Sequence, residues 1–335
     1  MTLKWRGDTA QVKESLLERL APEQVLIKGL EPFGADTSSD INGRPDIVVF
    51  ALRNDDVQWV CKTATRFKIP ITVRGAGTGN TGAAVPIFGG IVLSLEKMNQ
   101  ILDLDLGNKM MVVQAGAITG EIQKQAEAQG LFYPPDPQSA ATCTIGGNIA
   151  QNAGGPRAVK YGVTGHYVLG LTGFLIDGTP FTYGGKQVKN VAGYNLMQLL
   201  IGSEGTLGIV TEITLKLRTK PNISQDALLL FSNYEDAVAT LTDLHTQHLE
   251  PSKVEFIDGF CFEAVAKQTK IENNYQSSPA SLLIECDGYS ENEVDQMMDH
   301  IHRIATNHHL KEYKCFKTPE ENAQIWDMRM NFSTA

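Results

Sequence analysis

The distribution of glycine constrains this chain more than any other feature of its sequence. Of its 31 glycines, 25 lie between Gly75 and Gly208, and only Gly259 and Gly288 follow. Glycine adopts a positive φ at no steric cost and lets a ligand approach the main chain closely. The middle of the chain is therefore predicted to form tight turns and ligand-cradling loops, and the part after it to fold differently.

Histidine changes in the opposite direction along the chain. Six of the seven histidines lie after residue 240, where glycine is scarce. Two composition changes in the same part of the chain indicate a domain boundary, which we place near Lys216–Pro221.

Composition excludes several classes of protein. The 335 residues carry 29 Lys and Arg against 38 Asp and Glu, a net charge of −9 that argues against non-specific nucleic-acid binding. No apolar run reaches the roughly 18 residues of a membrane helix, and the charged N-terminal residues argue against a signal peptide. The five cysteines are widely spaced without a CxxC motif, so we expect reduced thiols in a cytoplasm.

Hydrophobic periodicity predicts an α+β chain. Before the middle region it indicates a β-α-β unit, with strands at 47–52 and 71–73 around a helix that Asn54 caps. The part after residue 220 alternates again, with strands at 227–231, 253–257 and 281–285 and helices at 234–248, 260–270 and 291–306. This pattern predicts a lobe with an antiparallel sheet, followed only by a short helix near residue 325.

The first glycine loop, RGAGTGNTG at 74–82, contains the spacing GxGxxG of dinucleotide-binding proteins. That fold requires a helix at the third glycine, but AAVPIFGG follows here, and no GK[ST] of a phosphate-binding P-loop is present. Two interpretations remain: a pyrophosphate cradle built from backbone N–H groups, or a plain glycine turn.

Two further loops are richer in polar residues. PPDPQSAATCTIGGNIAQNAGG at 134–155 combines small polar side chains with paired glycines, and GSEGTLGIV at 202–210 leads into a strand. A long surface loop would explain the first of these. A large ligand shared by all the loops would explain them together.

Taken in order, these motifs resemble a known family. RGAGTG, PPDPxSxxxxTIGGNIAxNAGG, KYG and GYNLMQLLIGSEGTLGIVTEITLKL are similar to the FAD-binding domain of flavin-dependent D-2-hydroxyacid dehydrogenases, the group that includes glycolate oxidase flavin subunits and D-lactate dehydrogenases. The resemblance implies an α+β fold: a two-subdomain FAD-binding domain of the vanillyl-alcohol-oxidase/PCMH type followed by a partial ferredoxin-like cap lobe. Residues 1–40 would be an N-terminal helical segment, 41–219 the FAD-binding domain, and 220–335 a substrate or cap domain lacking its C-terminal part.

The resemblance also implies FAD contacts along all the loops. The first would hold the pyrophosphate, the second would line the flavin, and the third would hold the ribityl or adenine end. The residues concerned are Arg74, Gly75, Ala76, Gly77, Thr78, Gly79, Pro135, Asp136, Ser139, Thr142, Gly146, Gly147, Asn148, Asn152, Gly155, Tyr161, Gly162, Glu204, Gly208 and Ile209. Some relatives attach FAD through a histidine in the first loop. None occurs between residues 1 and 165 here, so FAD is expected to bind non-covalently.

The implied reaction is hydride transfer to the flavin from C2 of a small D-2-hydroxy acid such as glycolate or D-lactate. In that family an arginine in a WxxR segment grips the substrate carboxylate, and IWDMRMNFS at 325–333 matches this segment. Arg329 is therefore the candidate carboxylate clamp, and Ser333 a candidate assisting hydroxyl. The alternative is a surface arginine on a short amphipathic helix.

One departure from the family leaves the function open. The family's base and metal-binding histidines lie in motifs of the HxGDGNxH kind, which this sequence lacks, so no metal site is expected. His245 and His248 have i, i+3 spacing but no evident third ligand. The chain is either a cytoplasmic flavin subunit passing electrons to a partner subunit, peripheral to a membrane only through partners, or a truncated or split FAD-binding module that needs a partner chain to catalyse.

Overall fold

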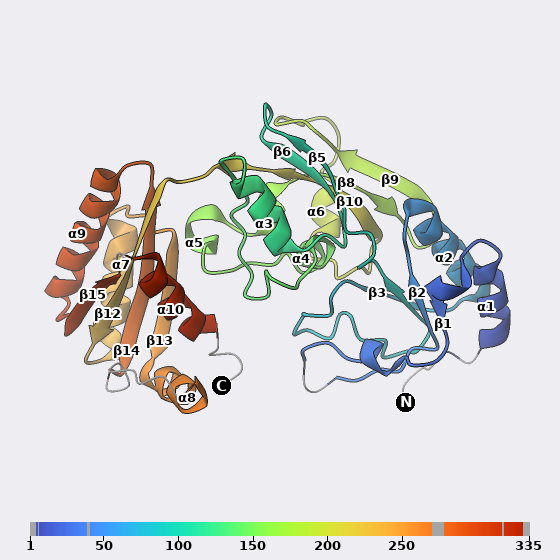
Figure 1. Ribbon diagram of the computed structural model, residues 1–335, viewed down its shortest axis with the longest axis horizontal. Helices are drawn as coiled ribbons and strands as arrows, with labels where there is room; N and C mark the ends of the chain where they lie inside the picture. Colours follow the sequence, from blue (N-terminus) through green and yellow to red (C-terminus); the bar gives the residue numbers. More distant parts are fainter. Residues whose placement is uncertain (1–4, 6, 39–40, 270–277, 317, 331–335) are drawn as a thin grey trace. The chain divides into compact units, whose positions relative to one another are not determined.

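The computed structural model describes residues 5, 7–38, 41–269, 278–316 and 318–330. The chain forms two compact units, whose elements are labelled in Figure 1. The first unit comprises Met1–Ala153 and Val163–Thr219, and the second comprises Gly154–Gly162 and Lys220–Ala335. The chain therefore leaves the first unit for one short segment, contributes that segment to the second unit, and returns.

The first unit contains two main sheets. One has the order β1–β2–β4–β3, with β1 antiparallel to β2 and with β2 and β3 both parallel to β4. Its strands are Val25–Leu26 (β1), Ile47–Phe50 (β2), Ile71–Arg74 (β3) and Ile91–Ser94 (β4). β2 and β4 are almost continuously buried, as strands of covered parallel sheets are.

Helix α2 (Asn54–Phe67) connects β2 to β3 and packs on β4 and on β8 of the second sheet. Its buried apolar side chains recur at helical spacing: Val57, Val60, Cys61 and Ala64. The helix ends at Lys68, which adopts the left-handed conformation (φ 48°) ahead of Pro70. The prediction that Asn54 caps this helix is wrong. Asn54 is the first helical residue, and its side-chain amide donates to Glu212 of the second sheet.

The second sheet is antiparallel, with the order β5–β6–β10–β8–β9. Its strands are Ile101–Asp105 (β5), Met110–Gln114 (β6), Val168–Phe174 (β8), Pro180–Gly184 (β9) and Ile209–Lys216 (β10). β10 is the long strand predicted after the third glycine loop, and it lies at the centre of this sheet. A separate pair joins Leu131–Phe132 (β7) to Arg218–Thr219 (β11).

Short helices complete the first unit. They are Thr9–Leu17 (α1), Thr119–Glu127 (α3), Ile145–Gln151 (α4) and Met197–Leu200 (α6), with 3-10 turns at Pro22–Gln24, Glu31–Phe33 and Thr164–Tyr167. α1 packs on α2. α4 begins at Ile145 within the second loop, because Thr144 caps it by accepting a hydrogen bond from the Gly147 N–H.

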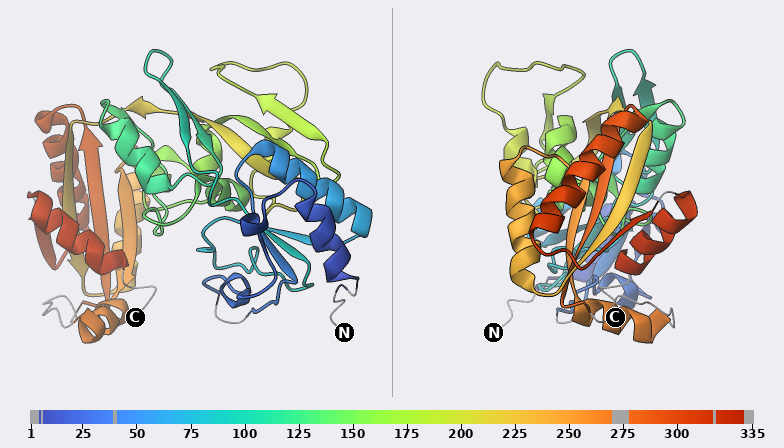
Figure 2. Two further views of the ribbon diagram at one scale, coloured as in Figure 1. Left: turned by 45° about the vertical axis from the view of Figure 1, so that its right-hand side comes forward. Right: turned by 90° about the vertical axis from the view of Figure 1, so that its left-hand side faces the viewer.

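The second unit is built on a four-stranded antiparallel sheet with the order β13–β14–β12–β15. The strands are Ile223–Phe231 (β12), Lys253–Asp258 (β13), Ala280–Gly288 (β14) and Glu312–Phe316 (β15). The helices are Ala158–Tyr161 (α5), Tyr234–Thr246 (α7), Gly259–Thr269 (α8), Glu291–Asn307 (α9) and Pro319–Met330 (α10). α7 and α9 lie on one face of the sheet and α10 on the other (Figures 1 and 2).

Two apolar clusters follow from the alternation of side chains along β12 and β14. Leu229, Phe231 and Leu282 point to α7 and α9, whereas Leu228 and Leu283 point to α8 and α10. The sequence did not predict β15. Only Phe316 of that short strand is fully buried, so its apolar pattern is weak. β15 pairs with β12 and covers that edge of the sheet.

Candidate functional sites

The first glycine loop begins where β3 ends at Arg74. Gly77 has a φ of +71° and Gly82 a φ of +79°, so both positions favour glycine. The Arg74 guanidinium lies inside this turn and donates to backbone carbonyls on both sides of it, at 2.8 Å to Ala35 and 3.4 Å to Ala84. Burial lowers the pKa of Arg74, and Asp36 is the first of the opposing charges that raise it. In the structure Arg74 holds the loop in place; its contact with phosphate remains a prediction.

A segment that the sequence analysis did not single out forms the rim of this loop. The Thr37 N–H and hydroxyl both donate to the Gly79 carbonyl, at 3.1 and 2.6 Å. The Asp36 carboxylate accepts from the Gly82 N–H at 2.9 Å. Asp36 and Thr37 therefore fix the shape of the loop from outside. Their short polar side chains shortly after Gly34 could have indicated a loop-bracing role in the sequence.

The inner side of the loop is made of main chain. In the part of the chain that the structure describes, the N–H groups of residues 75–79 donate no hydrogen bond. Successive free N–H groups on a tight turn form a nest that suits an anion. A Cβ on Gly79 would meet only Asp36 Oδ2 at 4.0 Å, so there is open space beside the turn. These residues fit the pyrophosphate of FAD.

Backbone and side-chain hydrogen bonds hold the second loop in place. The Ser139 carbonyl accepts from the Thr142 and Cys143 N–H groups, both at 2.8 Å. Asn148 is buried, and its side-chain amide donates to the Thr119 hydroxyl at 2.6 Å. The Asn152 side chain, at a residue of φ 47°, accepts from the Gly165 N–H at 2.9 Å.

The remaining predicted residues of this loop shape its backbone. The Pro135 carbonyl accepts from Gln123 at 2.7 Å, and Asp136 follows it, partly exposed. A Cβ on Gly146 would lie 2.8 Å from that of Ala115, so only glycine fits there. Gly147 is less crowded, with the Thr144 hydroxyl at 3.3 Å from such a Cβ.

The structure brings the three glycine loops of the first unit together. A Cβ on Gly75 would lie 2.1 Å from the Thr144 hydroxyl, so the first and second loops touch at that point. The Glu204 N–H, at a residue of φ 55°, donates to the carbonyl of Ala150 in α4 at 2.9 Å. Gly205 lies against Val73, which precedes the first loop; a Cβ added to Gly205 would lie 3.5 Å from Val73 Cβ.

The third loop ends at the start of β10. Gly208 is buried beside Phe181, where an added Cβ would lie at 3.2 Å, and Ile209 is 2% exposed. These two residues therefore pack inside the first unit, and Glu204 is the exposed member of the predicted set. The convergence of three loops far apart in sequence is what a large shared ligand requires.

Three predicted FAD residues, Gly155, Tyr161 and Gly162, belong to the second unit. The Tyr161 hydroxyl donates to Asp287 Oδ2 at 2.6 Å, and Lys160 Nζ lies 2.5 Å from Asp287 Oδ1. Asp287 is buried on β14 and therefore holds the segment that carries α5. The Tyr161 hydroxyl therefore donates its hydrogen to Asp287.

The face of the second unit's sheet that carries α10 is charged. Asp226, Glu285 and Lys253 lie directly opposite one another on β12, β14 and β13. Lys253 Nζ pairs with Glu285 Oε2 at 2.7 Å, and Ser252 donates to Glu285 Oε1 at 2.7 Å. We refer to Asp226, Glu285 and Lys253 as the charged row. Burial, with the nearby Glu285 charge, raises the pKa of Asp226 to about 6.

Arg329 lies at the edge of this face. Its Nη2 donates to Glu255 Oε1 at 3.0 Å, and both side chains are about one fifth exposed, at 22% and 20%. Trp326, one turn earlier, donates to Asp226 at 2.8 Å. Ser333 lies outside the described residues. The sequence analysis identified Arg329 by its motif but missed Glu255 and Asp226, which only cross-strand register brings near it.

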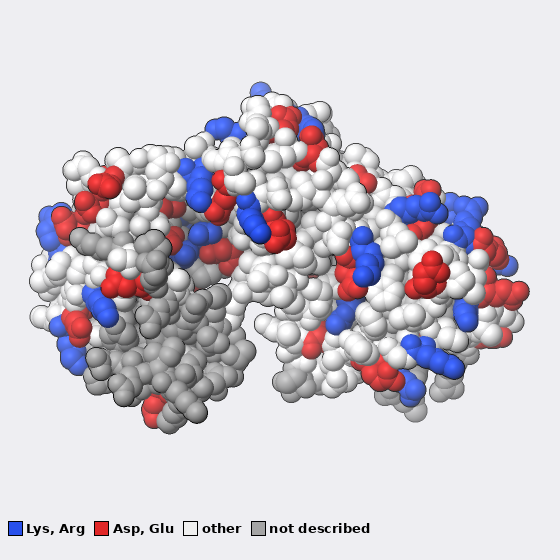
Figure 3. Space-filling model, viewed as in Figure 1, with Lys and Arg blue, Asp and Glu red and all other residues white. Residues whose placement is uncertain are grey.

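No group of three metal-ligating side chains occurs among the described residues. The histidines have other neighbours: His300 bonds to Gln247, His308 to Asp243, and His302 stacks on Tyr313. No described helix is long and apolar enough to span a membrane. On the face that Figure 3 shows, described acidic and basic side chains are interspersed.

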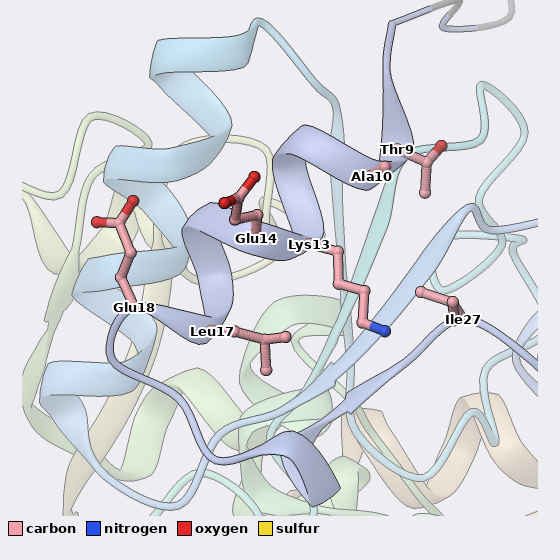
Figure 4. Close-up of a pocket in the computed structure, with 7 residues that line it drawn as sticks. All are labelled: Thr9, Ala10, Lys13, Glu14, Leu17, Glu18 and Ile27. Atoms are coloured by element: carbon pink, nitrogen blue, oxygen red, sulfur yellow. The ribbon is translucent and has the colours of Figure 1, made fainter.

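An open groove beside α1 is separate from the glycine loops (Figure 4). It is lined by Thr9, Ala10, Lys13, Glu14, Leu17, Glu18 and Ile27. None of these residues was predicted to bind FAD or substrate.

A nest of free N–H groups among converging glycine loops suits the phosphates of a large cofactor. Residues 45–184 match the family model of a FAD binding domain, and residues 220–335 match that of FAD linked oxidases, C-terminal domain. The chain belongs to the FAD-linked oxidase family. It is a FAD-linked oxidoreductase with a vanillyl-alcohol-oxidase/PCMH-type FAD-binding domain and an oxidase C-terminal domain.

Curated relatives agree with this assignment. The glycolate oxidase subunit GlcD of Bacillus subtilis (strain 168) is 37% identical over 329 residues, which are 98% of this chain and 70% of the relative. The D-lactate dehydrogenase of Anaerostipes hadrus is 36% identical over 326 residues, 93% of this chain and 67% of the relative. The chain thus spans about two thirds of the length of these relatives.

Solved structures share the fold. An alkyldihydroxyacetonephosphate synthase aligns with a TM-score of 0.79 at 21% identity, covering 98% of this chain and 64% of that one. p-Cresol methylhydroxylase aligns with a TM-score of 0.76 at 18% identity, covering 98% of this chain and 70% of that one. At these identities the likeness concerns the fold alone.

Proposed function

We propose that this protein oxidises a small D-2-hydroxy acid, such as glycolate or D-lactate, to the 2-oxo acid with non-covalently bound FAD. The observation that carries the proposal is the convergence of the three glycine loops on one turn with free N–H groups, together with a partly exposed arginine in the matching WxxR segment. The names of the two curated relatives supply the substrate class.

The roles of the chain's own residues follow from their chemistry. The N–H groups of residues 75–79 would hold the pyrophosphate, and Arg74, Asp36 and Thr37 would keep the loop in shape. When bound, FAD supplies a two-electron acceptor for the hydride of C2. Arg329 would bind the substrate carboxylate, for which its planar guanidinium is suited.

The glycolate oxidase relative is named as a subunit, so we propose an electron-accepting partner subunit as well. The rival proposal is a FAD-binding module that does not catalyse without a partner chain. The observation that favours the rival is the lack of an HxGDGNxH-type motif in this sequence.

The test uses the purified chain loaded with FAD. Its visible spectrum is recorded without oxygen before and after adding D-lactate or glycolate. Bleaching of the flavin supports the oxidoreductase, and a yellow protein that stays oxidised supports the module. Arg329→Met should raise KM about 100-fold without changing FAD affinity. Arg303→Met, which removes an exposed arginine of α9, is the matched control and should change neither.

A further inference from the structure

Helix α10 is fixed to the charged face of the sheet at two points. Trp326 Nε1 donates to Asp226 Oδ1 at 2.8 Å, and Arg329 Nη2 donates to Glu255 Oε1 at 3.0 Å. Residues three apart lie on the same side of a helix, so both contacts face the sheet. Ile325 is buried in the adjoining apolar cluster. Two carboxylates from different strands therefore hold the helix that carries the candidate clamp.

The Trp326 ring is held from a second direction. Lys253 Nζ lies 4.1 Å from the ring centroid while it also pairs with Glu285. Lys253 and Asp226 both oppose Glu285 across neighbouring strands, so the sheet register sets their spacing. The charged row thus orients Trp326 through its N–H edge and its ring face together.

The contact with Glu255 uses only part of Arg329. A guanidinium has five N–H donors in a fixed planar fork. Within the described ranges, Nη1 and Nε of Arg329 have no hydrogen-bond partner, and the side chain is 22% exposed. Glu255 therefore holds one nitrogen and leaves two others for an incoming anion.

We propose that Glu255 and Asp226 are positioning residues for Arg329: they anchor α10 on the sheet and set the direction in which the free guanidinium nitrogens meet a substrate carboxylate. This rests on the proposed function, in which Arg329 is the clamp. Neither carboxylate is assigned contact with the substrate.

The anchor at Asp226 depends on ionisation. The described charged groups on the elements around Asp226 are Glu285 and Asp287 on β14, Lys253, Glu255 and Asp258 on β13, Glu312 and Lys314 on β15, Glu321 and Arg329 on α10, and Arg157 and Lys160 on the α5 segment. Burial and Glu285 raise the pKa of Asp226 to about 6, whereas the Trp326 hydrogen bond, Lys253 and Arg157 lower it. The Trp326 bond therefore favours the ionised carboxylate, and the clamp is best ordered above about pH 6.

The first experiment measures KM and kcat of the FAD-loaded chain with D-lactate or glycolate. Glu255→Ala and Asp226→Ala should each raise KM about 10-fold with kcat within about threefold. Glu255→Gln and Asp226→Asn keep an acceptor oxygen and should raise KM only about threefold. Wild-type KM should rise as pH falls from 7.5 to 5.5, and KM of Asp226→Asn should stay flat. Asp243→Asn, on α7 at the opposite face, is the control with unchanged values.

The second measurement needs no turnover. In the Trp5→Phe, Trp59→Phe background Trp326 is the one remaining tryptophan. Its emission should titrate with a midpoint near pH 6, Asp226→Asn should abolish that titration, and D-lactate should shift the emission unless Arg329 is changed to Met. If no hydroxy acid reduces the flavin, the proposed function fails, and the emission data alone then decide this inference. An emission unaffected by Asp226→Asn or by D-lactate, or a KM unmoved by all four variants, overturns it.

Discussion

The candidate site of the first unit consists of backbone groups, and that of the second unit consists of side chains. In the first unit the glycine loops present backbone N–H groups, and side chains such as Arg74 and Asp36 serve to hold that backbone. In the second unit the site face presents charged side chains, with Asp226, Glu255 and Lys253 around Trp326 and Arg329. A backbone site is sensitive to added atoms and to φ, whereas a side-chain site is sensitive to charge and pH. The expected effects of substitution differ accordingly.

The largest expected effect is a core truncation that should leave the first unit's site intact. Leu282 on β14 is fully buried against α7 and α9. Leu282→Ala should lower the free energy of unfolding by about 2–5 kcal/mol, because it leaves a cavity. Urea denaturation measures the loss, and FAD affinity measured well below the transition should not change. A parallel loss of FAD affinity would show that the site of the first unit depends on the core of the second.

The next effect concerns the backbone site. Gly77→Ala would place a Cβ 2.2 Å from Arg74 Nη2 at a φ of +71°. Strain at positive φ costs roughly 1–2 kcal/mol, and the displaced guanidinium adds to it. FAD affinity, measured by quenching of flavin fluorescence, should fall about 100-fold.

Gly130→Ala is the matched control for Gly77→Ala. It has a similar φ of +70° but nothing within 4 Å of the new Cβ. It should cost about 1 kcal/mol of stability without changing FAD affinity. Equal FAD affinities for the two variants would show that crowding at Arg74 does not matter.

A smaller effect is a pH dependence of stability that comes from Asp226 in the second unit. Because the pKa of Asp226 is about 6 in the folded chain against an ordinary value of 3.8, the folded state binds more protons between these values. The free energy of unfolding therefore falls as pH rises from about 4 to 6, by roughly 1–3 kcal/mol from this group. Asp226→Asn should remove that slope in urea denaturation at pH 4.5 and 7.5. A slope that persists in the variant would assign the titration to another group.

The smallest effect is expected at a surface pair of the second unit. Asp243 and His308 lie 2.8 Å apart with side chains 42% and 25% exposed. Exposed pairs contribute little because water and salt screen them, so Asp243→Asn should change stability by less than about 0.5 kcal/mol. A loss of more than about 1 kcal/mol in thermal unfolding would show that polar contacts on the outer face matter as much as the charged row.

Much of the fold could be predicted from local patterns. Apolar periodicity predicted α2, α7, α9 and strands β2, β12 and β14, since each holds enough buried residues at one spacing. It missed β15, where only Phe316 is fully buried. The glycine loops could be recognised from the sequence because a Cβ at Gly77 or Gly146 would clash with neighbouring atoms. Such positions require glycine, so the loops appear as clusters of glycine.

The positions of the glycine loops, the chemistry of Arg329 and the family of the motifs could be read from the residues alone. Only the folded chain shows that Arg74 turns inward, that residues 154–162 join the second unit, and that Asp226 and Glu255 contact α10. The reason is physical. Periodicity along one strand sets which face a side chain occupies, but the pairing of strands far apart in sequence sets which charges become neighbours.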